Sequence, residues 1–383
     1  MRRILLAWEL GGGFGHVVIL RRIASRLKTH GFRFVAAVKD LGAAVALADD
    51  GIEVVQAPLW NAPQSSATLG DTLADVGFGN PQVLRPRLEA WRAIIDRYRP
   101  ALVISDYAPG ANLIARGRVP LAVIGNGFTL PPSEMAFFPP LHQNSPPVWR
   151  EGQILESINS VTSDLGLVRL QWLPELFEGD VKWVYTFPLL DPYAAWRHQP
   201  AQGPIVEEPE PRVADPTEIL IYLSWPSMRR PLFQALRPFA KDIRVFAPAL
   251  PAHELAAAAD LGMRVETQPF RLMHDLARAR HVIHLGSGGT ATACLWAGVP
   301  QLACAMDIEK ELNGRALARA GVGKLIPIYD SDIELTEDIF AEALADEITA
   351  ERAEELGEQL RAQYQGADPF AEFEAACLAL ASP

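Results

Sequence analysis

The stretch from His281 to Gly298 constrains the fold more than any other part of the chain. Its apolar run Val282–Leu285 is long enough for a buried strand, and Gly286–Gly289 forms a turn that favours residues tolerating positive φ. An alanine-rich helix is predicted from Thr290, and it ends at Gly298. A strand that leads through a glycine turn into a helix is the repeating unit of α/β proteins.

The same arrangement predicts an anion site. Backbone N–H groups at the start of the helix, with a partial charge of about +0.5, point toward an incoming ligand. The glycines let a diphosphate approach closely, and side chains at the strand end and in the turn add hydrogen-bond donors. The predicted diphosphate ligands are His284, Gly286, Ser287, Gly288, Gly289 and Thr290. Many α/β turns carry glycine and bind nothing, so the pattern alone also allows a purely structural turn.

Strands and helices alternate along the first half of the chain. Apolar runs predict strands at residues 4–8, 32–38, 52–55, 102–105, 121–124 and 182–187. Helices are predicted at residues 17–28, 87–97 and 108–116, with a further alanine-rich helix between the second and third strands. This alternation predicts a parallel sheet with helices on both faces. Two irregular segments that follow strands, 58–86 and 128–150, are expected to bind a variable substrate.

A second alternating run follows a segment rich in Pro and Glu. Its strands are predicted at residues 218–223, 244–247, 264–267, 282–285 and 301–305, and its helices at 231–240, 252–261, 272–279, 290–297 and 309–320. We therefore predict two Rossmann-like, doubly wound parallel-sheet domains, residues 1–199 and 217–365, joined by a linker at 200–216. A helix within 366–383 is expected to close the chain by packing back on the first domain.

Length and composition agree with a two-domain globular protein. The chain has 383 residues, of which 49% are hydrophobic and 21% charged. The net charge of −11 argues against a nucleic-acid backbone as the main partner, although a few local donors suffice for a small anion. The three cysteines, Cys294, Cys304 and Cys377, lack metal-ligand spacing and are expected to be reduced core thiols, which favours the cytoplasm.

The first residues resemble the opening of a signal peptide, but Glu9 interrupts the apolar run and Gly11–Gly13 follows in place of a cleavage site. A first buried strand is therefore predicted. No apolar run approaches the ~20 residues that cross a membrane, so no transmembrane segment is expected. Peripheral membrane contact and the oligomeric state stay open.

Two such halves, with the phosphate motif in the second, resemble the GT-B fold of nucleotide-sugar glycosyltransferases. The matching stretches are His284-Leu285-Gly286-Ser287-Gly288-Gly289-Thr290, Gly298-Val299-Pro300 and Glu309-Lys310-Glu311-Leu312-Asn313-Gly314. They are similar to the donor-binding signature of the inverting group of UDP- and TDP-sugar transferases that includes macrolide, plant secondary-metabolite and glucuronosyl transferases. The resemblance implies that His284 and the 286–290 turn hold the pyrophosphate.

The resemblance also assigns the rest of the donor. It implies that Glu309 and Lys310 hydrogen-bond the sugar, although Lys310 stands where the family has Gln, which leaves the sugar unidentified. It places Phe270 and Arg271 near the base, without the family's usual Trp, and Ser224 near the phosphates, without the usual glycine-rich context.

The first half carries an independent match. Gly13-Phe14-Gly15-His16, followed by a helix, resembles the family's N-terminal Gly-His element, in which the histidine is the catalytic base. Gly13 and Gly15 of this element are also donor-binding candidates. Asp106, at the end of a strand, resembles the carboxylate that orients that base. A neutral imidazole can take the proton of an acceptor hydroxyl, and a carboxylate can stabilise the imidazolium that forms.

The resemblance therefore implies an inverting, metal-independent glycosyltransferase without a cofactor, whose UDP- or TDP-linked donor and hydroxyl-bearing small-molecule or lipid acceptor are its partners. Asp330-Ser331-Asp332 spells the metal-binding triplet of a different glycosyltransferase fold, but it lies late in the chain, where Asp and Ser serve as turn residues. A sugar-nucleotide epimerase and a non-catalytic nucleotide-sugar binder are alternatives with the same fold.

A more remote alternative is an NAD-dependent oxidoreductase. Gly11 and Gly13 after a strand, with Asp40 ending the next strand, are similar to a dinucleotide-binding fingerprint. His16, however, stands where that fingerprint needs Gly or Ala for close packing of helix on strand. This interpretation also assigns no function to the second glycine motif, Gly286–Gly289.

Overall fold

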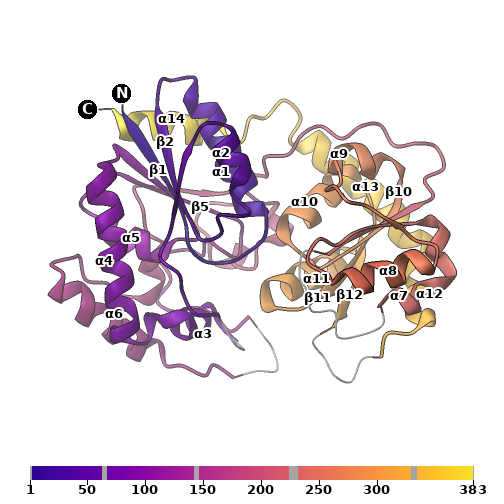
Figure 1. Ribbon diagram of the computed structural model, residues 1–383, viewed down its shortest axis with the longest axis horizontal. Coiled ribbons are helices and arrows are strands. Elements are labelled where there is room, and N and C mark those ends of the chain that lie inside the picture. The colour runs from indigo at the N-terminus through magenta and orange to yellow at the C-terminus, as the bar shows by residue number, and fades with distance from the viewer. Residues whose placement is uncertain (1, 63–66, 142–145, 224–231, 329–333, 383) are drawn as a thin grey trace. The chain divides into compact units, whose positions relative to one another are not determined.

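The structure is a computed structural model that describes residues 2–62, 67–141, 146–223, 232–328 and 334–382. The chain divides into two compact units (Figure 1). The first consists of Met1–Ile205 with Asp368–Pro383, and the second of Val206–Ala367. Each unit is a parallel sheet between helices, which confirms the prediction of two Rossmann-like doubly wound sheets.

In the first unit the described residues form a six-stranded parallel sheet of order β3-β2-β1-β4-β5-β6. Its strands are β1 (Arg3–Trp8), β2 (Arg33–Val38), β3 (Glu53–Gln56), β4 (Leu102–Asp106), β5 (Leu121–Gly125) and β6 (Val181–Val184). This is the doubly wound order in which the chain reverses direction across the sheet between β1 and β4. The two strands are in register, with Trp8 opposite Asp106, so their carboxyl ends lie side by side.

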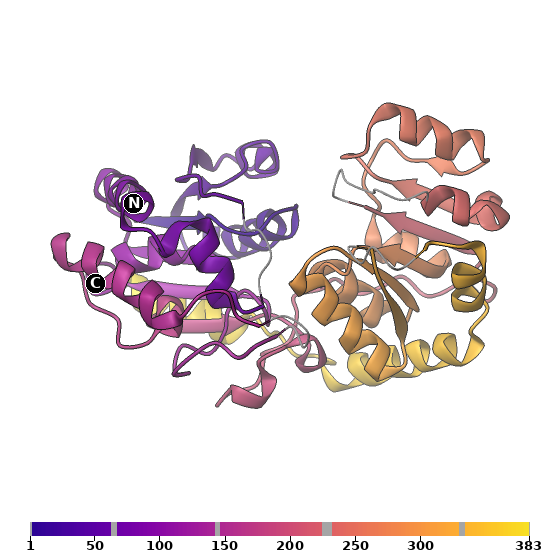
Figure 2. The same ribbon diagram turned by 90° about the horizontal axis from the view of Figure 1, so that it is seen from below.

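Helices cover both faces of this sheet (Figures 1 and 2). They are α1 (Gly15–Lys28), α2 (Val45–Asp49), α3 (Leu69–Leu73), α4 (Pro81–Tyr98), α5 (Pro109–Ala115), α6 (Glu151–Asp164) and α14 (Ala371–Ala381). The apolar side chains of α1, α2 and α14 share one core with the strands. On the other face α4 lies against α5 and α6.

The C-terminal helix α14 completes the core of the first unit. Phe373 stacks on Trp183 of β6 with 4.8 Å between ring centroids, and Phe370 meets the same ring edge-on. Burying one such ring stabilises a fold by roughly 1.5–3 kcal/mol. The Arg2 guanidinium donates to the Ala381 carbonyl over 2.6 Å, so both ends of the chain lie at the same side of this unit.

The second unit repeats the topology, with the described strands in the order β12-β11-β10-β7-β8-β9. The strands are β7 (Glu218–Tyr222), β8 (Ile243–Phe246), β9 (Arg264–Val265), β10 (Ala279–His284), β11 (Gln301–Ala305) and β12 (Gly323–Pro327). The helices are α7 (Leu232–Ala235), α8 (Ala252–Asp260), α9 (Leu272–Asp275), α10 (Gly288–Ala297), α11 (Ile308–Ala320), α12 (Glu337–Leu344) and α13 (Glu347–Gln363). The direction reverses between β7 and β10, so the Gly286 turn lies at the topological switch point.

Several elements differ from the sequence-based expectation. The irregular segment 58–86 contains α3, which begins with a capping box between Thr68 and Asp71. Helix α4 begins at Pro81, six residues earlier than expected, because Asn80 caps it and Pro suits its first position. Residues 206–216 have no helix or strand but belong to the second unit, since the Val213 N–H donates to the Ala277 carbonyl.

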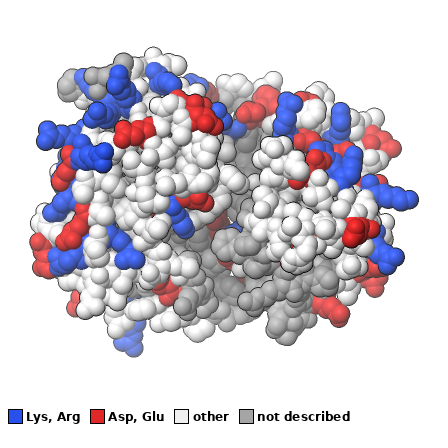
Figure 3. All heavy atoms as spheres, viewed as in Figure 1, with Lys and Arg blue, Asp and Glu red and all other residues white. Residues whose placement is uncertain are grey.

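Among the helices that the structure describes, none has both the length and the apolarity that a membrane crossing requires. On the face shown in Figure 3, basic and acidic side chains are interspersed.

Candidate active site

In the first unit the candidate site lies at the switch point between β1 and β4. His16 is the second residue of α1, and Asp106 is the last residue of β4. The Nδ1 atom of His16 lies 2.8 Å from Oδ2 of Asp106, whose side chain is 0% exposed while that of His16 is 11% exposed. The Tyr185 hydroxyl donates to Oδ1 of the same carboxylate over 3.4 Å. A buried carboxylate thus faces one nitrogen of a partly accessible imidazole.

Two aromatic rings set the plane of the imidazole. Trp8 stacks on His16 with 5.0 Å between centroids and 21° between planes. Tyr107 is nearly parallel to the imidazole at 6.4 Å and 18°. Since Nδ1 faces Asp106, Nε2 is the nitrogen on the far side of the ring, as a proton acceptor for a substrate hydroxyl requires.

Gly11 lies directly against Nε2. A Cβ built onto Gly11 would lie 2.7 Å from that atom and 3.2 Å from the Tyr107 ring, and Gly11 has a φ of +74°. The Gly11 carbonyl accepts a hydrogen bond from Lys39 Nζ over 2.6 Å, and burial lowers the pKa of Lys39. Gly11 therefore meets both a conformational and a steric demand beside His16.

Gly13 and Gly15 of the same glycine loop are the donor-binding candidates of the first unit. Gly13 has a φ of +83°, and Gly15 begins α1. Their part in donor binding remains a prediction. Asp40, which the oxidoreductase interpretation needs as a ribose ligand, accepts the Ala43 N–H within its own turn.

In the second unit the turn between β10 and α10 presents a helix N-terminus. Gly286 has a φ of +87°, and Ser287 is the N-cap residue of α10. Among the described residues, the Ser287 side chain makes no capping hydrogen bond and the first turn of α10 contains no acidic group. Ser287 and Gly288 are half-buried, Gly289 is exposed and Thr290 is buried. This N-terminus has the charge and the accessibility that an anion needs.

Helix α11 packs against this turn. The Asn313 amide donates to the Gly286 carbonyl over 2.8 Å, and a Cβ built onto Gly286 would lie 2.6 Å from the Lys310 carbonyl oxygen. The structure thereby places Glu309 and Lys310, in the first turn of α11, beside the predicted diphosphate turn. Lys310 Nζ pairs with the Asp307 carboxylate.

His284 is a structural part of the turn. Its Nδ1 accepts the Gly286 N–H over 3.0 Å, and its Nε2 lies 3.0 Å from Oε1 of Gln301, which assigns the proton to Nε2. Burial lowers the pKa of His284 to about 4, so the ring is neutral at pH 7. To donate a hydrogen bond to a diphosphate, Nε2 of His284 would have to give up its hydrogen bond to Gln301. Diphosphate binding by His284 remains a prediction.

An aromatic cluster lies near the predicted base position. Phe270 meets Tyr222 and Phe246 edge-on at 6.5 and 6.2 Å, and the Arg244 guanidinium lies 5.3 Å from the Phe270 ring centroid. Arg271 is exposed beside it. The base-binding roles of Phe270 and Arg271 remain predictions. Ser224 and the 330–332 triplet lie outside the described residues.

The structure adds residues that the sequence analysis did not select. Tyr185, Tyr107 and Gly11 contact the His16–Asp106 pair or its surroundings, while Gln301 and Asn313 hold the Gly286 turn. Two of these residues carried a signal in the sequence: Gly11 belongs to the glycine loop after the first strand, and Asn313 lies in the segment that matches the donor signature. Among the described residues, no cluster of three or more His, Cys, Asp and Glu has the geometry to hold a metal ion.

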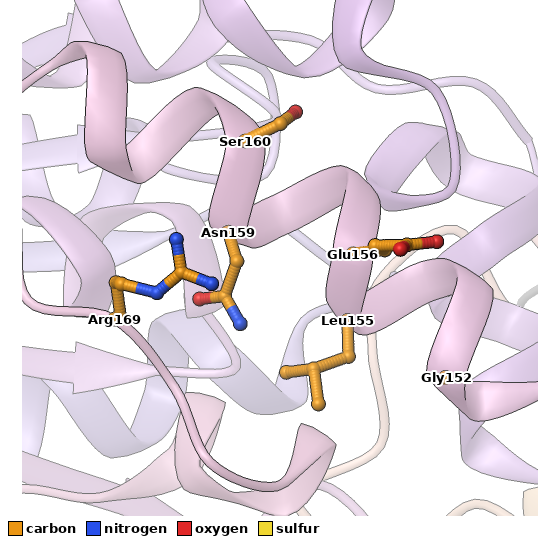
Figure 4. Close-up of a pocket in the computed structure, with 6 residues that line it drawn as sticks. All are labelled: Gly152, Leu155, Glu156, Asn159, Ser160 and Arg169. Atoms are coloured by element: carbon orange, nitrogen blue, oxygen red, sulfur yellow. The ribbon is translucent and has the colours of Figure 1, made fainter.

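A separate groove of about 560 Å³ lies along α6 in the first unit (Figure 4). It is lined by Gly152, Leu155, Glu156, Asn159, Ser160 and Arg169. The Asn159 amide is occupied by both backbone groups of Leu170 over 2.9 Å. The groove contains none of the predicted site residues.

Acid is expected to destabilise the second unit through His281 and His284. Burial lowers the pKa of each to about 4, whereas an exposed histidine has a pKa of 6.5. Below pH 6.5 the unfolded chain therefore binds more protons than the folded chain. The free energy of unfolding is highest above pH 6.5 and falls as the pH approaches 4, by about 3 kcal/mol per histidine. Urea unfolding between pH 7.5 and 4.5 measures this loss. His284→Gln should flatten the dependence and exposed His253→Gln should not; equal slopes would contradict the assignment.

No protein-family model and no curated sequence matches the chain. Several solved structures match the chain over nearly its whole length. The calicheamicin glycosyltransferase CalG4 has 20% sequence identity and a TM-score of 0.70, with 100% of this chain and 99% of that chain covered. The spinosyn rhamnosyltransferase SpnG complexed with spinosyn aglycone has 18% identity and a TM-score of 0.65, with 98% and 99% covered. The glycosyltransferase VinC in complex with dTDP has 16% identity and a TM-score of 0.62, with 99% of each chain covered.

These similarities extend over nearly the whole of each chain and include both doubly wound sheets. The resemblance found in the sequence is therefore confirmed at the level of architecture, and the chain has the GT-B fold of the glycosyltransferase structures that it matches.

Proposed function

We propose that this chain is an inverting glycosyltransferase that moves a sugar from a nucleotide diphosphate-sugar to a hydroxyl-bearing small molecule or lipid. The observation that carries the proposal is the 2.8 Å contact between His16 and the buried Asp106 at the switch point of the first sheet. The matched structures of the same fold, CalG4 and SpnG, are glycosyltransferases.

In the proposed reaction His16 is the general base. Nε2 takes the proton of the acceptor hydroxyl. At the same time the hydroxyl oxygen forms a bond to the anomeric carbon of the donor sugar, from the side opposite the leaving group. The bond from that carbon to the diphosphate oxygen breaks, which inverts the configuration. Asp106 at Nδ1 holds the proton-accepting tautomer and stabilises the imidazolium that forms.

The leaving diphosphate gains negative charge as the bond breaks. We assign its stabilisation to the N-terminus of α10, with the N–H groups of residues 288–290 as donors in a fixed array. Donors of this kind are oriented before the reaction, so they require no reorganisation while the charge develops. The proposed mechanism includes no metal ion. VinC was solved with dTDP and SpnG with an aglycone, which supports a thymidine diphosphate-linked donor and an aglycone-like acceptor for this chain. A uridine diphosphate-linked donor is the alternative that the sequence resemblance implies.

A panel of sugar nucleotides tested by thermal shift should reveal the donor. A ligand at a hundred times its Kd stabilises the folded state by about 2.7 kcal/mol. Mass spectrometry of the products, with and without candidate acceptors, then identifies the reaction. A glycosylated acceptor supports transfer. Donor conversion without acceptor would indicate an epimerase, binding without conversion a non-catalytic binder, and binding of NAD(H) alone an oxidoreductase.

We also propose a cytoplasmic location for the enzyme. Its three cysteines are free, buried thiols. Reduced, buried cysteines are typical of proteins that work in a reducing compartment.

A further inference from the structure

A buried carboxyl group that the proposed mechanism does not use follows directly after Trp8, the residue that stacks on His16. Glu9 follows directly after β1 and is 0% exposed. Burying a carboxyl group is costly unless it is hydrogen-bonded. Oε1 of Glu9 accepts the Gly110 N–H, and Oε2 accepts the Trp91 indole N–H. Glu9 thus joins the end of β1 to α4 and to the beginning of α5.

The contact with Gly110 caps a helix. Gly110 is the second residue of α5, and the N-cap residue Ala108 has no side-chain acceptor of its own. The Glu9 carboxyl, from the residue that follows β1, supplies an acceptor at the end of the helix that favours negative charge. A Cβ built onto Gly110 would lie 2.9 and 3.0 Å from the two carboxyl oxygens, so this close approach requires glycine.

The capped helix begins directly after the turn that holds Asp106. Tyr107 in that turn has a φ of +50°, an unfavourable conformation for a tyrosine that the surroundings must hold. The next residue after Glu9, Leu10, donates its N–H to the Tyr107 carbonyl over 3.1 Å. Glu9 and Leu10 therefore tie the loop that leads to His16 to the turn that carries Asp106 and Tyr107.

We propose that Glu9 is a positioning residue that, through Gly110, holds the Asp106–Tyr107 turn in register with His16. The effect of Glu9 on the rate of sugar transfer rests on the proposed function, whereas its effect on the geometry of the His16–Asp106 pair does not. Burial raises the pKa of Glu9 to about 7, and the N–H groups of Gly110 and Trp91 favour the charged form. An apolar residue at position 9 would avoid this desolvation cost, but it would leave the N–H groups of Gly110 and Trp91 without their acceptor.

The test compares Glu9→Gln and Gly110→Ala with Asn159→Ala. Asn159 is a buried polar residue on α6 of the same unit and is hydrogen-bonded to the backbone of Leu170, so its loss lowers stability without contact to the His16 loop. The first readout is the downfield proton NMR signal of His16 Nδ1–H, assigned by its absence from His16→Ala. It should be lost or shifted in Glu9→Gln and Gly110→Ala and retained in Asn159→Ala.

The second readout is kinetic. Glu9→Gln and Gly110→Ala should lower kcat about tenfold or more at an unchanged KM for the donor, because small misplacements of a catalytic group are costly. Gly110→Ala displaces the same carboxyl group, so it carries the test if Glu9→Gln does not fold. An Nδ1 signal unchanged in both variants would overturn the proposal. If the wild type transfers no sugar, the NMR result still decides the role of Glu9, and only the proposed function fails.

Discussion

Replacing His16 by alanine is expected to lower kcat by about 10²–10⁴-fold, the usual contribution of a positioned general base. The expected loss follows from geometry, because His16 is the only described imidazole held against Asp106, with Trp8 and Tyr107 setting the plane of its ring. Transfer rates measured at saturating donor and acceptor give the effect.

Donor binding provides the control for this variant. The predicted diphosphate turn belongs to the other unit, so isothermal titration should give nearly the same Kd for the donor in His16→Ala as in the wild type. Asp106→Asn should bind the donor equally well and also lose kcat, because its amide no longer stabilises an imidazolium. Full turnover by His16→Ala would show that another group takes the proton.

Gly286→Ala is expected to weaken donor binding by about a hundredfold or more and to destabilise the second unit. Gly286 has a φ of +87°, which costs a residue with a Cβ about 1–2 kcal/mol. The added Cβ would also lie 2.6 Å from the Lys310 carbonyl oxygen and 3.2 Å from its carbonyl carbon, and this backbone cannot rotate away. The turn or the start of α11 must therefore shift, which misplaces the N–H groups of α10. Titration with the donor and thermal unfolding measure the two effects.

The same turn offers a matched comparison. Gly289 is exposed, is not among the glycines with positive φ, and has no described atom within 4 Å of a Cβ built onto it. Gly289→Ala should leave the unfolding temperature unchanged and reduce donor affinity less than Gly286→Ala does. Equal destabilisation by the two substitutions would mean that the conformation of Gly286 and its contact with Lys310 do not hold the turn.

The local features of the site were predictable because they lie within a few residues of each other. The apolar run, the glycine turn and the helix from Val282 to Ala297 form one continuous pattern, and the structure has β10, the Gly286 turn and α10 at that place. His16 and Asp106 were selected from two separate strand ends. Both strands belong to one parallel sheet, whose carboxyl ends share an edge, so the pairing followed once the alternation was recognised.

Segments whose partners are distant in the sequence were not predictable in this way. Helix α3 depends on a capping box and on the Asp71 carboxylate, which also accepts the N–H groups of Val148 and Trp149 more than seventy residues away. In the sequence the segment is rich in Pro, Gly, Ser, Asn and Asp, which favour turns and give no helical periodicity. Helix α6, which begins directly after the second irregular segment, was likewise not predicted.

The sequence by itself determined two parallel-sheet units, the glycine turn between a strand and a helix, and the candidate pair His16 and Asp106, because periodicity, glycine and strand ends are local properties of the chain. Only the tertiary structure decided that His284 and Gln301 hold the turn, that Gly11 borders His16, and that Glu9 caps α5. In the sequence Glu9 is visible only as a charged residue that interrupts an apolar run. Its meaning depends on Trp91 and Gly110, 82 and 101 residues further along the chain, and folding alone brings these groups within hydrogen-bonding distance.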